Sequence, residues 1–338
     1  MAVRVAINGF GRIGRCVLRT AWNDPGIEFV HINDLTSDAL LAHLLRVDSV
    51  HGAFSEEVAA VDGGIRVGDT LIPTTAEPDP SRLPWRDSEV DVVLECTGHF
   101  TAREKAQLHV DAGARKVIIS APAKGADATV CVGVNDHILD PEHHHVISNA
   151  SCTTNCLSPM AKVLQDSFGI RQGLMTTVHA YTMDQNLLDA PHRKGDFRRA
   201  RAAGVNMVPT STGAAKAVGM VLPMLDGKLN GMAIRVPVPN GSLVDLVVEL
   251  ETNTSVEAIN AAMEEAANGP LSGILEASRA PLVSGDIIGN PHSSIVDLPL
   301  TIGMGEKSFK LLSWYDNEWG FSNRLVDLVH ILFDQANR

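Results

Sequence analysis

One cysteine of this chain stands where nucleophilic chemistry is favoured. The segment Asn149–Cys156 follows a β-type run and opens a helical pattern, so Cys152 falls in the first turn of the predicted helix. The apolar residues of that helix recur at helical spacing: Leu157, Met160, Ala161 and Leu164. The dipole of a helix favours a thiolate at this end. A thiolate attacks aldehydes, and the thioester that follows remains reactive toward a second nucleophile.

The sequence says less about the roles of the neighbouring thiol, Cys156, and of the histidines. Cys156 lies one turn further along the same helix, and we interpret it as a small buried residue because no further metal ligands accompany the pair. The run His143–His145 follows Pro141 and is typical of a solvated turn, with metal binding as the alternative. We therefore predict no metal. A thiol also needs a base, and the local sequence does not single one out among the 13 histidines.

A second chemical motif is the glycine-rich turn Gly9–Gly14, which separates a predicted strand from a predicted helix. In this motif Gly9 permits the tight turn, Gly11 lets a pyrophosphate approach the backbone, and Gly14 lets the helix pack closely on the strand. The helix N-terminus presents unpaired N–H groups to phosphates. Asp34 ends the next predicted strand, where a carboxylate accepts hydrogen bonds from ribose hydroxyls and repels a 2′-phosphate. This context predicts a dinucleotide site that prefers NAD, with NADP possible but less favoured.

Basic residues gather in one short stretch of an otherwise acidic chain: Arg193, Lys194, Arg198, Arg199 and Arg201. The stretch is either a solvated charge run or subunit contact, or a phosphate site, because guanidinium groups bind phosphate in a two-pronged fashion. Thr210–Lys216 adds hydroxyls and N–H groups at a predicted helix start. Arg235 lies within an apolar strand pattern, where its charge needs an anionic partner that a bound substrate could supply.

The elements that must position these residues alternate through the first part of the chain. Short β-branched runs are predicted as strands at Val3–Asn8, Glu28–Asn33, Asp91–Glu95, Lys116–Ser120 and Val146–Ser148. Helical patterns lie between them at Arg12–Trp22, Ala39–Val47 and Ala102–Ala112. This alternation is typical of a doubly wound, Rossmann-type parallel sheet. Residues 1–150 are therefore predicted to form a nucleotide-binding domain of α/β class.

Beyond residue 150 the pattern changes to longer strands. Gly231–Val238 and Ser242–Leu250 have few helices between them, which indicates a second, α+β domain with a mixed or antiparallel sheet. His179 follows another β-type run, Leu174–Val178, and lies at a predicted strand end. A polar stretch without clean periodicity follows, and a loop of that length is usually functional. A helix over Gly320–Gln335 closes the chain.

Composition narrows the class of protein. The 338 residues are 45% hydrophobic and 20% charged, and no run approaches the about 18 apolar residues of a membrane span. The net charge of −12 disfavours nucleic acid as a partner, and we expect no membrane partner either. The five cysteines are irregularly spaced, as reduced intracellular thiols are. With no signal sequence at the start, we expect a cytoplasmic protein.

Taken together, the motifs resemble the phosphorylating glyceraldehyde-3-phosphate dehydrogenase family over nearly the whole chain. Four blocks carry the resemblance: Ala6–Arg15, Ile147–Cys156, Ser211–Lys216 and Trp314–Glu318. The resemblance implies oxidation of glyceraldehyde 3-phosphate to 1,3-bisphosphoglycerate with NAD and inorganic phosphate. It implies that Cys152 forms a thiohemiacetal and then a thioester, and that His179 is its base.

The same resemblance implies roles for further residues. Thr182 and Arg235 would hold the phosphate of the substrate. The site of the attacking phosphate would be lined by Ser151, Thr153, Arg199, Thr212 and Gly213. The cofactor would contact Gly9, Gly11, Arg12, Ile13, Gly14, Asp34, Ser120 and Asn317, with Thr97, Gly98 and Phe100 nearby. The loop 181–206 would be an S-shaped loop packed between subunits of a homotetramer. Residues 151–317 would be the catalytic domain, and the helix 318–338 would return to the cofactor domain.

Several positions depart from the family pattern. Pro78 replaces an arginine found near the adenine in many members, Met183 replaces a common asparagine near the nicotinamide, and Phe321 replaces a common tyrosine. The pair Ala190-Pro191 is intermediate between NAD-specific and NADP-using relatives. With Asp34, this predicts a preference for NAD with tolerance of NADP.

Two other functions remain open at this point. An erythrose-4-phosphate dehydrogenase would share the cysteine, the histidine and the run Asn317–Phe321, but its pattern differs at Ser211–Gly213 and at Thr182. A non-catalytic NAD-binding regulator could use the same fold, although the intact Cys152 argues against it. A cysteine hydrolase would leave the glycine-rich turn without a purpose.

Overall fold

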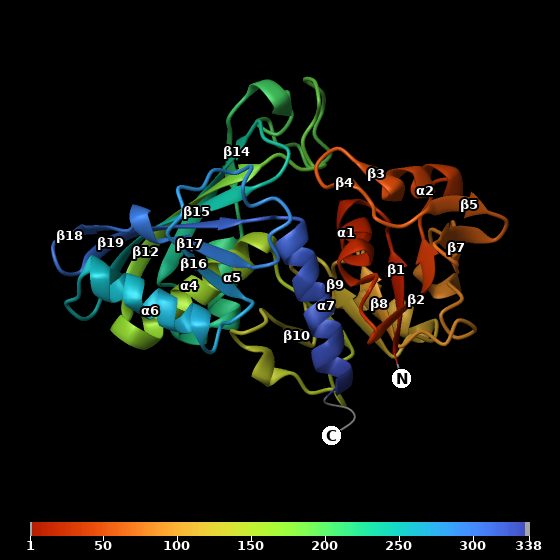
Figure 1. Cartoon of the computed structure of the whole chain (residues 1–338), viewed down its shortest axis with the longest axis horizontal. Helices are drawn as coiled ribbons and strands as arrows, with labels where there is room; N and C mark the ends of the chain where they lie inside the picture. Colours follow the sequence, from red (N-terminus) through yellow and green to blue (C-terminus); the bar gives the residue numbers. More distant parts are fainter. Residues whose placement is uncertain (1, 335–338) are drawn as a thin grey trace. The chain divides into compact units, whose positions relative to one another are not determined.

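The computed structural model describes residues 2–334, whose contacts divide them into two compact units (Figure 1). The first unit contains residues 2–132, 136–151 and 322–334, and the second contains 133–135 and 152–321. Among residues 2–334, none of the helices combines the length and apolar content needed to cross a bilayer. Each unit is organised around its own β-sheet.

The first unit is built on a nine-stranded sheet in the order β10-β11-β9-β8-β1-β2-β7-β6-β5. Its strands are β1 (Val3–Asn8), β2 (Ile27–Asn33), β5 (Val58–Val61), β6 (Gly64–Val67), β7 (Thr70–Thr75), β8 (Val92–Glu95), β9 (Lys116–Ile119), β10 (Ala128–Thr129) and β11 (Val146–Ser148). From β10 to β7 all neighbours are parallel, whereas β7, β6 and β5 form an antiparallel meander. Two short strands, β3 (Val47–Asp48) and β4 (Gly52–Ala53), pair with each other. The meander was not anticipated from the sequence.

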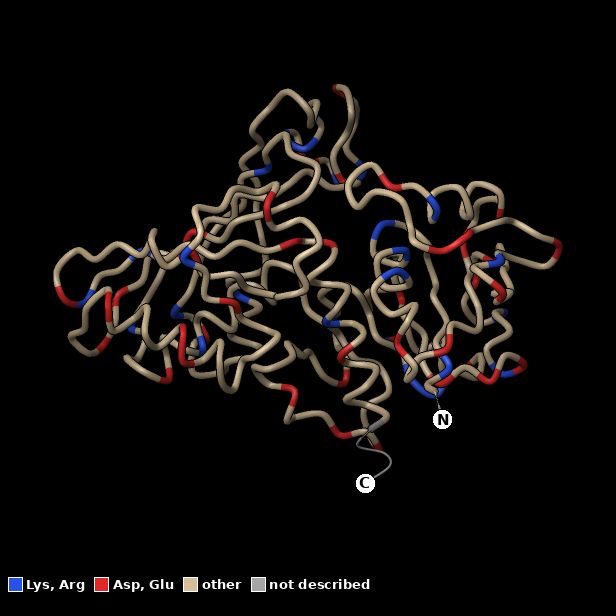
Figure 2. The backbone as a smooth tube through the Cα atoms, viewed as in Figure 1, with Lys and Arg blue, Asp and Glu red and all other residues tan. Residues whose placement is uncertain are grey.

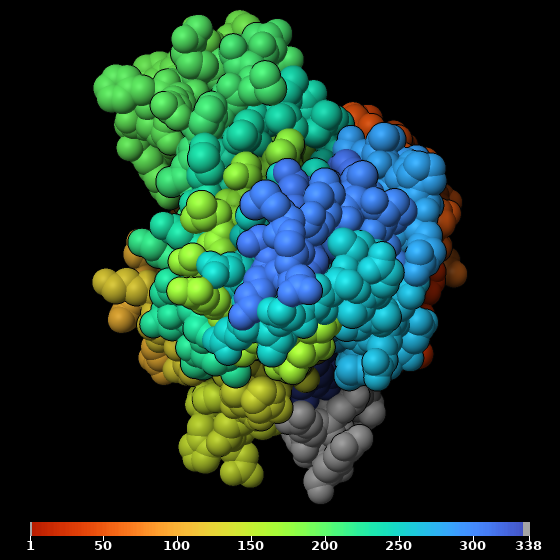
Figure 3. Space-filling model, turned by 90° about the vertical axis from the view of Figure 1, so that its left-hand side faces the viewer, coloured from red at the N-terminus to blue at the C-terminus, as the bar shows by residue number. Residues whose placement is uncertain are grey.

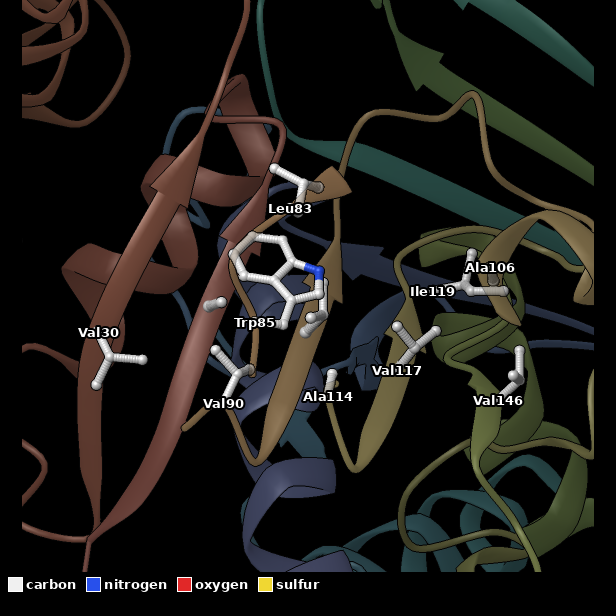
Figure 4. Close-up of a cluster of buried hydrophobic side chains, with 11 residues drawn as sticks. Val30, Leu83, Trp85, Val90, Ala106, Ala114, Val117, Ile119 and Val146 are labelled. Atoms are coloured by element: carbon white, nitrogen blue, oxygen red, sulfur yellow. The ribbon is translucent and has the colours of Figure 1, made fainter. Parts of the chain in front are cut away.

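The crossover helices of this unit are α1 (Arg12–Ala21), α2 (Asp38–Arg46) and α3 (Arg103–Asp111). They follow β1, β2 and β8, so the chain winds as the βαβ pattern predicts. The core contains a fully buried Trp85 among small and branched side chains (Figure 4). Its other members are Ala6, Val30, Leu83, Val90, Val93, Ala106, Ala114, Val117, Ile119 and Val146.

The second unit has an eight-stranded mixed sheet in the order β13-β14-β12-β15-β19-β17-β16, with β18 paired to β19. Its strands are β12 (Ile170–Ala180), β13 (Val208–Ser211), β14 (Leu229–Val236), β15 (Ser242–Leu250), β16 (Leu275–Ser278), β17 (Ser294–Asp297), β18 (Ile302–Met304) and β19 (Ser308–Tyr315). The pairs β12/β14 and β16/β17 are parallel and the others are antiparallel. The predicted fold class, a mainly parallel α/β sheet followed by an α+β domain with a mixed sheet, is confirmed.

Helices cover one face of this second sheet. They are α4 (Cys152–Phe168), α5 (Ala214–Val221) and α6 (Val256–Asn268), and α4 packs against β12, β15, β17 and β19 (Figure 1). Alternate residues of β15 and β19 are buried, as expected for strands with one covered face. The opposite face carries exposed apolar side chains, among them Leu174 of β12 and Val247 of β15, which are register partners.

Between β12 and β13 the chain forms the long loop 181–206, which stands out from the rest of the second unit (Figure 3, green). Its apolar residues are largely exposed: Met183, Leu187, Leu188, Phe197 and Val205. The loop carries both acidic and basic positions (Figure 2). Arg201 pairs with Asp189, and Arg199 pairs with Asp184 and Asp196, so the loop is held by its own charges.

The last helix, α7, spans Trp319–Asp334. Its residues from Ser322 onward group with the first unit, where His330 Nε2 lies 2.7 Å from Asp24 Oδ2 and Phe333 packs under Arg115. The predicted helix over 320–335 matches this element as far as Asp334. Gln335, and the part of the predicted 318–338 segment that follows Asp334, lie outside the described residues.

Candidate active site

The glycine-rich turn of the first unit has the backbone geometry that a dinucleotide requires. Gly9 has φ +91°, and a Cβ on Gly14 would lie 2.4 Å from the Gly9 carbonyl oxygen, so both positions demand glycine. A Cβ on Gly11 would meet no protein atom of the described chain within 4 Å. Gly11 is also the N-cap of α1 and supplies no side-chain cap. This combination leaves open space in front of the first N–H groups of the helix, which fits a bound pyrophosphate.

Asp34 follows β2 directly, as predicted, and is half-buried. Its Oδ2 accepts a hydrogen bond from the Phe10 N–H at 2.8 Å, and its Oδ1 accepts one from the Thr36 N–H at 3.2 Å. A carboxylate has about four lone-pair sites, so it can still accept bonds from ribose hydroxyls. Arg12 opens α1, where its guanidinium forms an ion pair with Asp48.

Ile13 lies in the first turn of α1, and the four other predicted cofactor residues of this unit follow neighbouring parallel strands. Thr97, Gly98 and Phe100 come after β8, and Ser120 comes after β9. Because β9, β8, β1 and β2 are adjacent and parallel, these segments share one edge of the sheet with the glycine-rich turn.

A buried carboxylate braces that edge. Glu95 ends β8 and accepts hydrogen bonds from the side-chain amide of Asn8 at 2.6 Å and from the Thr97 N–H at 2.9 Å. His109 completes the set: Trp85 donates to its Nδ1 at 3.0 Å, so its Nε2 carries the proton that faces Glu95 at 3.1 Å. The Thr97 turn is thereby held against Gly9, since a Cβ on Gly9 would lie 2.7 Å from the Thr97 nitrogen.

In the second unit the nucleophile stands at the head of a long helix. Cys152 is the first residue of α4, as predicted, and Cys156 is fully buried one turn later. The turn that leads into α4 contains Ala150 at φ +54°, a conformation that non-glycine residues adopt rarely. A strained turn of this kind fixes the orientation of the residue that follows it, and strained backbone is typical of functional sites.

His179 lies beside the thiol. It occupies the penultimate position of β12, and its Nε2 is 3.5 Å from the Sγ of Cys152. Its Nδ1 is 2.7 Å from the Ala180 carbonyl oxygen and 2.7 Å from Nη1 of Arg235. Arg235 reaches this position because His179 and Arg235 are register partners in the parallel pair β12/β14. The structure therefore brings three of the predicted site residues into contact, namely Cys152, His179 and Arg235.

Burial dominates the protonation of this group. Burial raises the pKa of the Cys152 thiol, while the charge of Arg235 and hydrogen bonds from Thr153 oppose the rise. Burial, together with the charge of Arg235, lowers the pKa of His179 to about 3. The free site therefore holds a thiol and a neutral imidazole, although the predicted helix position of Cys152 favours the thiolate.

Tyr315 connects the elements that carry the two catalytic candidates, α4 with Cys152 and β12 with His179. Its hydroxyl lies 2.8 Å from Oγ1 of Thr153, which follows the nucleophile, and 2.8 Å from Oγ1 of Thr177, which shares β12 with His179. The ring of Tyr315 meets the His179 ring edge-on, with centroids 5.8 Å apart. Tyr315 is 1% exposed, so α4 and β12 are tied together from inside the unit.

The anion residues of the loop are joined by Asp184. This carboxylate contacts the Thr182 hydroxyl and the Arg199 guanidinium. The Nε of Arg199 donates to Thr210 Oγ1 at 3.0 Å. Burial acts to raise the pKa of Asp184, but the hydrogen bond from Thr182 and the charges of Arg235 and Arg199 outweigh it and lower the pKa, so the carboxylate lies within the field of both arginines.

Four more predicted site residues each have a different structural setting. They are Thr212, Gly213 and Asn317 of the second unit, and Ser151. Thr212 accepts a hydrogen bond from the Ala214 N–H at 3.1 Å, and Gly213 is the exposed N-cap of α5. Asn317 accepts a hydrogen bond from Ser242 Oγ at 2.8 Å, and that oxygen accepts one from the Ala180 N–H. Ser151, the residue before Cys152, groups with the first unit.

Comparisons with known proteins decide the family. The profile for "Glyceraldehyde 3-phosphate dehydrogenase, C-terminal domain" matches residues 151–317, and that for "Glyceraldehyde 3-phosphate dehydrogenase, NAD binding domain" matches residues 3–103. The chain is 56% identical to glyceraldehyde-3-phosphate dehydrogenase 1 of Streptomyces avermitilis over 335 residues, 99% of each chain. It belongs to the glyceraldehyde-3-phosphate dehydrogenase family. Two further relatives bear the same family name, glyceraldehyde-3-phosphate dehydrogenase 1 of Bacillus subtilis and glyceraldehyde-3-phosphate dehydrogenase of Geobacillus stearothermophilus. Each is 57% identical over 329 residues, 97% of this chain and 98% of the relative.

Membership confirms the resemblance and, with it, an NAD-dependent oxidoreductase with NAD as cofactor. Of the residues that depart from the family pattern, Met183 is 91% exposed in the loop and Phe321 is buried in α7.

Sequence reasoning missed several residues of this site. Asp184 had a local signal, since it lies two positions after Thr182 in a loop rich in arginine. Tyr315 lies in a block that the family shares, and the alternation Phe309, Leu311, Ser313, Tyr315 on the buried face of β19 could have placed it inside. Glu95 and Asp48 had no such signal, because their partners are distant in sequence.

Proposed function

We propose how this chain performs the activity of its family, the NAD-dependent and phosphate-dependent oxidation of D-glyceraldehyde 3-phosphate to 1,3-bisphosphoglycerate. The reaction is reversible and passes through a thiohemiacetal and a thioester of Cys152. One observation carries the assignment of residues: the Cys152 sulfur lies at the head of α4, 3.5 Å from Nε2 of His179. A thiol and an imidazole at that separation form a nucleophile and its base.

The steps follow from these two side chains. His179 accepts the thiol proton, and the Cys152 sulfur attacks the aldehyde carbon. The imidazolium returns the proton to the oxyanion, which gives the hydroxyl of the thiohemiacetal. His179 then accepts that hydroxyl proton as the carbon is oxidised to the thioester. Bound NAD supplies the hydride acceptor for this step. Inorganic phosphate attacks the thioester, releases the acyl phosphate and restores the sulfur of Cys152.

Two groups of residues bind the anions in this proposal. Thr182 and Arg235 hold the phosphate of the substrate, and the proximity of Arg235 to His179 supports this role. The attacking phosphate is held by Ser151, Thr153, Arg199, Thr212 and Gly213. The exposed N-cap Gly213 supports an anion there, because helix N-termini bind phosphate.

The cofactor contacts are proposed for residues of both units. In the first unit they are Gly9, Gly11, Arg12, Ile13, Gly14, Asp34, Thr97, Gly98, Phe100 and Ser120, and in the second Asn317. The open space at Gly11 supports this assignment. We further propose that residues 1–150, together with residues 318–338, form the cofactor domain, and residues 151–317 the catalytic domain. The proposed NAD preference, with tolerance of NADP, rests on the Asp34 carboxylate.

The enzyme is proposed to be a cytoplasmic homotetramer. The exposed apolar side chains of the loop 181–206, and of the uncovered sheet face at Leu174 and Val247, support burial against other subunits. All five cysteines lie within residues 2–334 and are free thiols, which supports a reducing compartment. Sedimentation velocity tests the assembly, and a monomer at micromolar concentration would contradict it.

Kinetics with purified protein test the function and the residues. With NAD, phosphate and glyceraldehyde 3-phosphate, Cys152→Ser is expected to lower kcat/KM by about 10⁴-fold or more, and His179→Asn by about 10²- to 10⁴-fold. Acyl phosphate should form only when phosphate is present. Faster turnover of erythrose 4-phosphate than of glyceraldehyde 3-phosphate would favour the rival aldehyde, and an unchanged rate in Cys152→Ser would refute the mechanism.

A further inference from the structure

The contact between Arg235 and His179 restricts where the imidazole proton can be. A guanidinium only donates hydrogen bonds, so a bond from Nη1 of Arg235 to Nδ1 of His179, 2.7 Å away, forms when Nδ1 is bare. In that tautomer the proton of the neutral ring lies on Nε2, which faces the Cys152 sulfur at 3.5 Å. In this tautomer Nε2 cannot accept a proton from the thiol or from a substrate hydroxyl.

The other tautomer has its own partner already in place. If Nδ1 carries the proton, it can donate to the Ala180 carbonyl oxygen, which lies 2.7 Å away. That carbonyl also accepts a bond from Nη1 of Arg235 at 2.9 Å, and its two lone pairs can serve both donors. With a proton on Nδ1, Nη1 of Arg235 cannot remain at 2.7 Å, because two N–H groups would face each other. The tautomer that acts as a base therefore requires Arg235 to leave.

Arg235 is free to bind an incoming anion. Its Nε is buried and has no hydrogen-bond partner within residues 2–334. The contacts of its Nη1 are with a neutral ring and a carbonyl, whereas Arg199 is paired with the carboxylates of Asp184 and Asp196. A phosphate dianion accepts two parallel hydrogen bonds from a guanidinium, which is a stronger interaction than a single bond to a neutral nitrogen.

From this geometry we propose that the phosphate of the substrate acts as a tautomer switch. By drawing Arg235 away from Nδ1, it lets Nδ1 donate to Ala180 and turns Nε2 into the proton acceptor beside Cys152. The proton balance is zero, because the ring takes one proton from solvent at Nδ1 and gives one to solvent from Nε2. The inference rests on the proposed function, in which Arg235 binds that phosphate, and in this added role Arg235 acts through His179 as a positioning residue.

The charged and titratable groups that face His179 come from four segments. They are Cys152 on α4, Arg235 on β14, Asp184 and Arg199 in the loop after β12, and Tyr315 on β19. Burial and the Arg235 charge lower the pKa of His179, and the Ala180 carbonyl raises it. An anion on Arg235 offsets the lowering contribution of the Arg235 charge. The pKa of His179 therefore increases when the anion binds, and the acid limb of the oxidation step moves to higher pH.

Alkylation of Cys152 by iodoacetamide tests the switch without using turnover. The full chain, loaded with NAD, is treated with iodoacetamide at pH 7 while phosphite is titrated, and labelling of Cys152 is followed by mass spectrometry. Phosphite should accelerate labelling, about tenfold for each unit by which the thiol pKa falls. An anion acting only through its charge would disfavour the thiolate and slow labelling. Phosphite that slows labelling, or leaves it unchanged, overturns the switch.

Two variants separate the switch from simple anion binding. Arg235→Leu has neither the charge nor the donor, so labelling should no longer respond to phosphite. Thr182→Val should need more phosphite but reach the same final acceleration, because Thr182 contacts Asp184 and not His179. Equal acceleration in Arg235→Leu and the parent would overturn the proposal.

A second measurement uses the pH dependence of glyceraldehyde oxidation, since this aldehyde lacks the phosphate. Phosphite should raise the plateau of the pH–rate profile and move its acid limb to higher pH. An anion that contributed binding energy alone would raise the plateau and leave the acid limb at the same pH. If the chain oxidises glyceraldehyde 3-phosphate but phosphite moves neither labelling nor the limb, the switch fails and the proposed function stands. If it does not oxidise glyceraldehyde 3-phosphate at all, the proposed function fails.

Discussion

Replacement of Tyr315 by phenylalanine tests whether one buried hydroxyl positions both catalytic residues. The hydroxyl lies 2.8 Å from Oγ1 of Thr153 and 2.8 Å from Oγ1 of Thr177. Each such bond contributes about 1 kcal/mol, so Tyr315→Phe should lower the free energy of unfolding by about 2 kcal/mol. For a unit of this size that is a fall of about 4–8 °C in Tm. The ring remains, so packing is largely unchanged.

The effect on catalysis should fall on one kinetic constant. Misplacement of Cys152 relative to His179 should lower kcat by about 10- to 100-fold, because positioning errors of about 1 Å have effects of this size. KM for glyceraldehyde 3-phosphate should change little, since the hydroxyl bonds to Thr153 and Thr177, whereas Thr182 and Arg235 are the residues proposed to hold the substrate's phosphate.

A double-mutant cycle with Thr177→Val measures the bond itself. Tm is determined by far-UV circular dichroism at fixed scan rate and protein concentration, because association makes Tm depend on concentration. The double variant should lose about 1 kcal/mol less than the two single variants combined, since the same bond is removed in each. Strictly additive losses, or a kcat equal to that of the parent, would refute the reasoning.

Three further predictions concern the first unit. Gly14→Ala should prevent stable NAD binding and lower Tm, because its Cβ would lie 2.4 Å from the Gly9 carbonyl oxygen. Gly11→Ala, whose Cβ meets no described protein atom within 4 Å, should keep the parental Tm and lose only NAD affinity, measured by calorimetry. Glu95→Gln should destabilise the chain by about 2–4 kcal/mol in urea unfolding, because an NH₂ group would face buried donors; an unchanged free energy of unfolding would contradict this role of the carboxylate. Burial lowers the pKa of His31 to about 4, so the unfolded chain, with a pKa near 6.5, binds the proton more readily. About 3 kcal/mol of stability should therefore be lost as pH falls from 6.5 to 4, and His31→Gln should lack this part of the pH dependence.

Local periodicity explains which parts of the fold could be predicted. The strands 3–8, 146–148 and 242–250 have the predicted bounds, and Cys152 and Asp34 occupy the predicted positions at an element end. These features depend on residues close together in sequence. The antiparallel meander 58–75 was missed because its strands are short and its pairing adds no distinctive alternation.

The contacts of the site could not be predicted in the same way. His179 is 27 residues from Cys152 and 56 from Arg235, and it meets the arginine only because β12 and β14 pair in one particular register. Tyr315 contacts Thr177 across 138 residues. A shift of one residue in either strand pairing would move these side chains to the opposite face. The family resemblance supplied His179, and the sheet register supplies the reason for its position.

The arginines proposed to bind anions in this chain of net charge −12 differ in how their charges are compensated. Arg12 is paired with Asp48, and Arg199 with Asp184 and Asp196, so an anion at either arginine must compete with a carboxylate. Arg235 faces only neutral groups through Nη1. Of these three arginines, only Arg235 has no carboxylate within ion-pair distance among residues 2–334, and it lies beside the catalytic histidine, where a charged ligand changes the chemistry most. The carboxylates at Arg12 and Arg199 weaken adventitious binding of anions at those two arginines. A substrate that carries its own phosphate is therefore selected at Arg235, where the same phosphate also prepares His179 as the base.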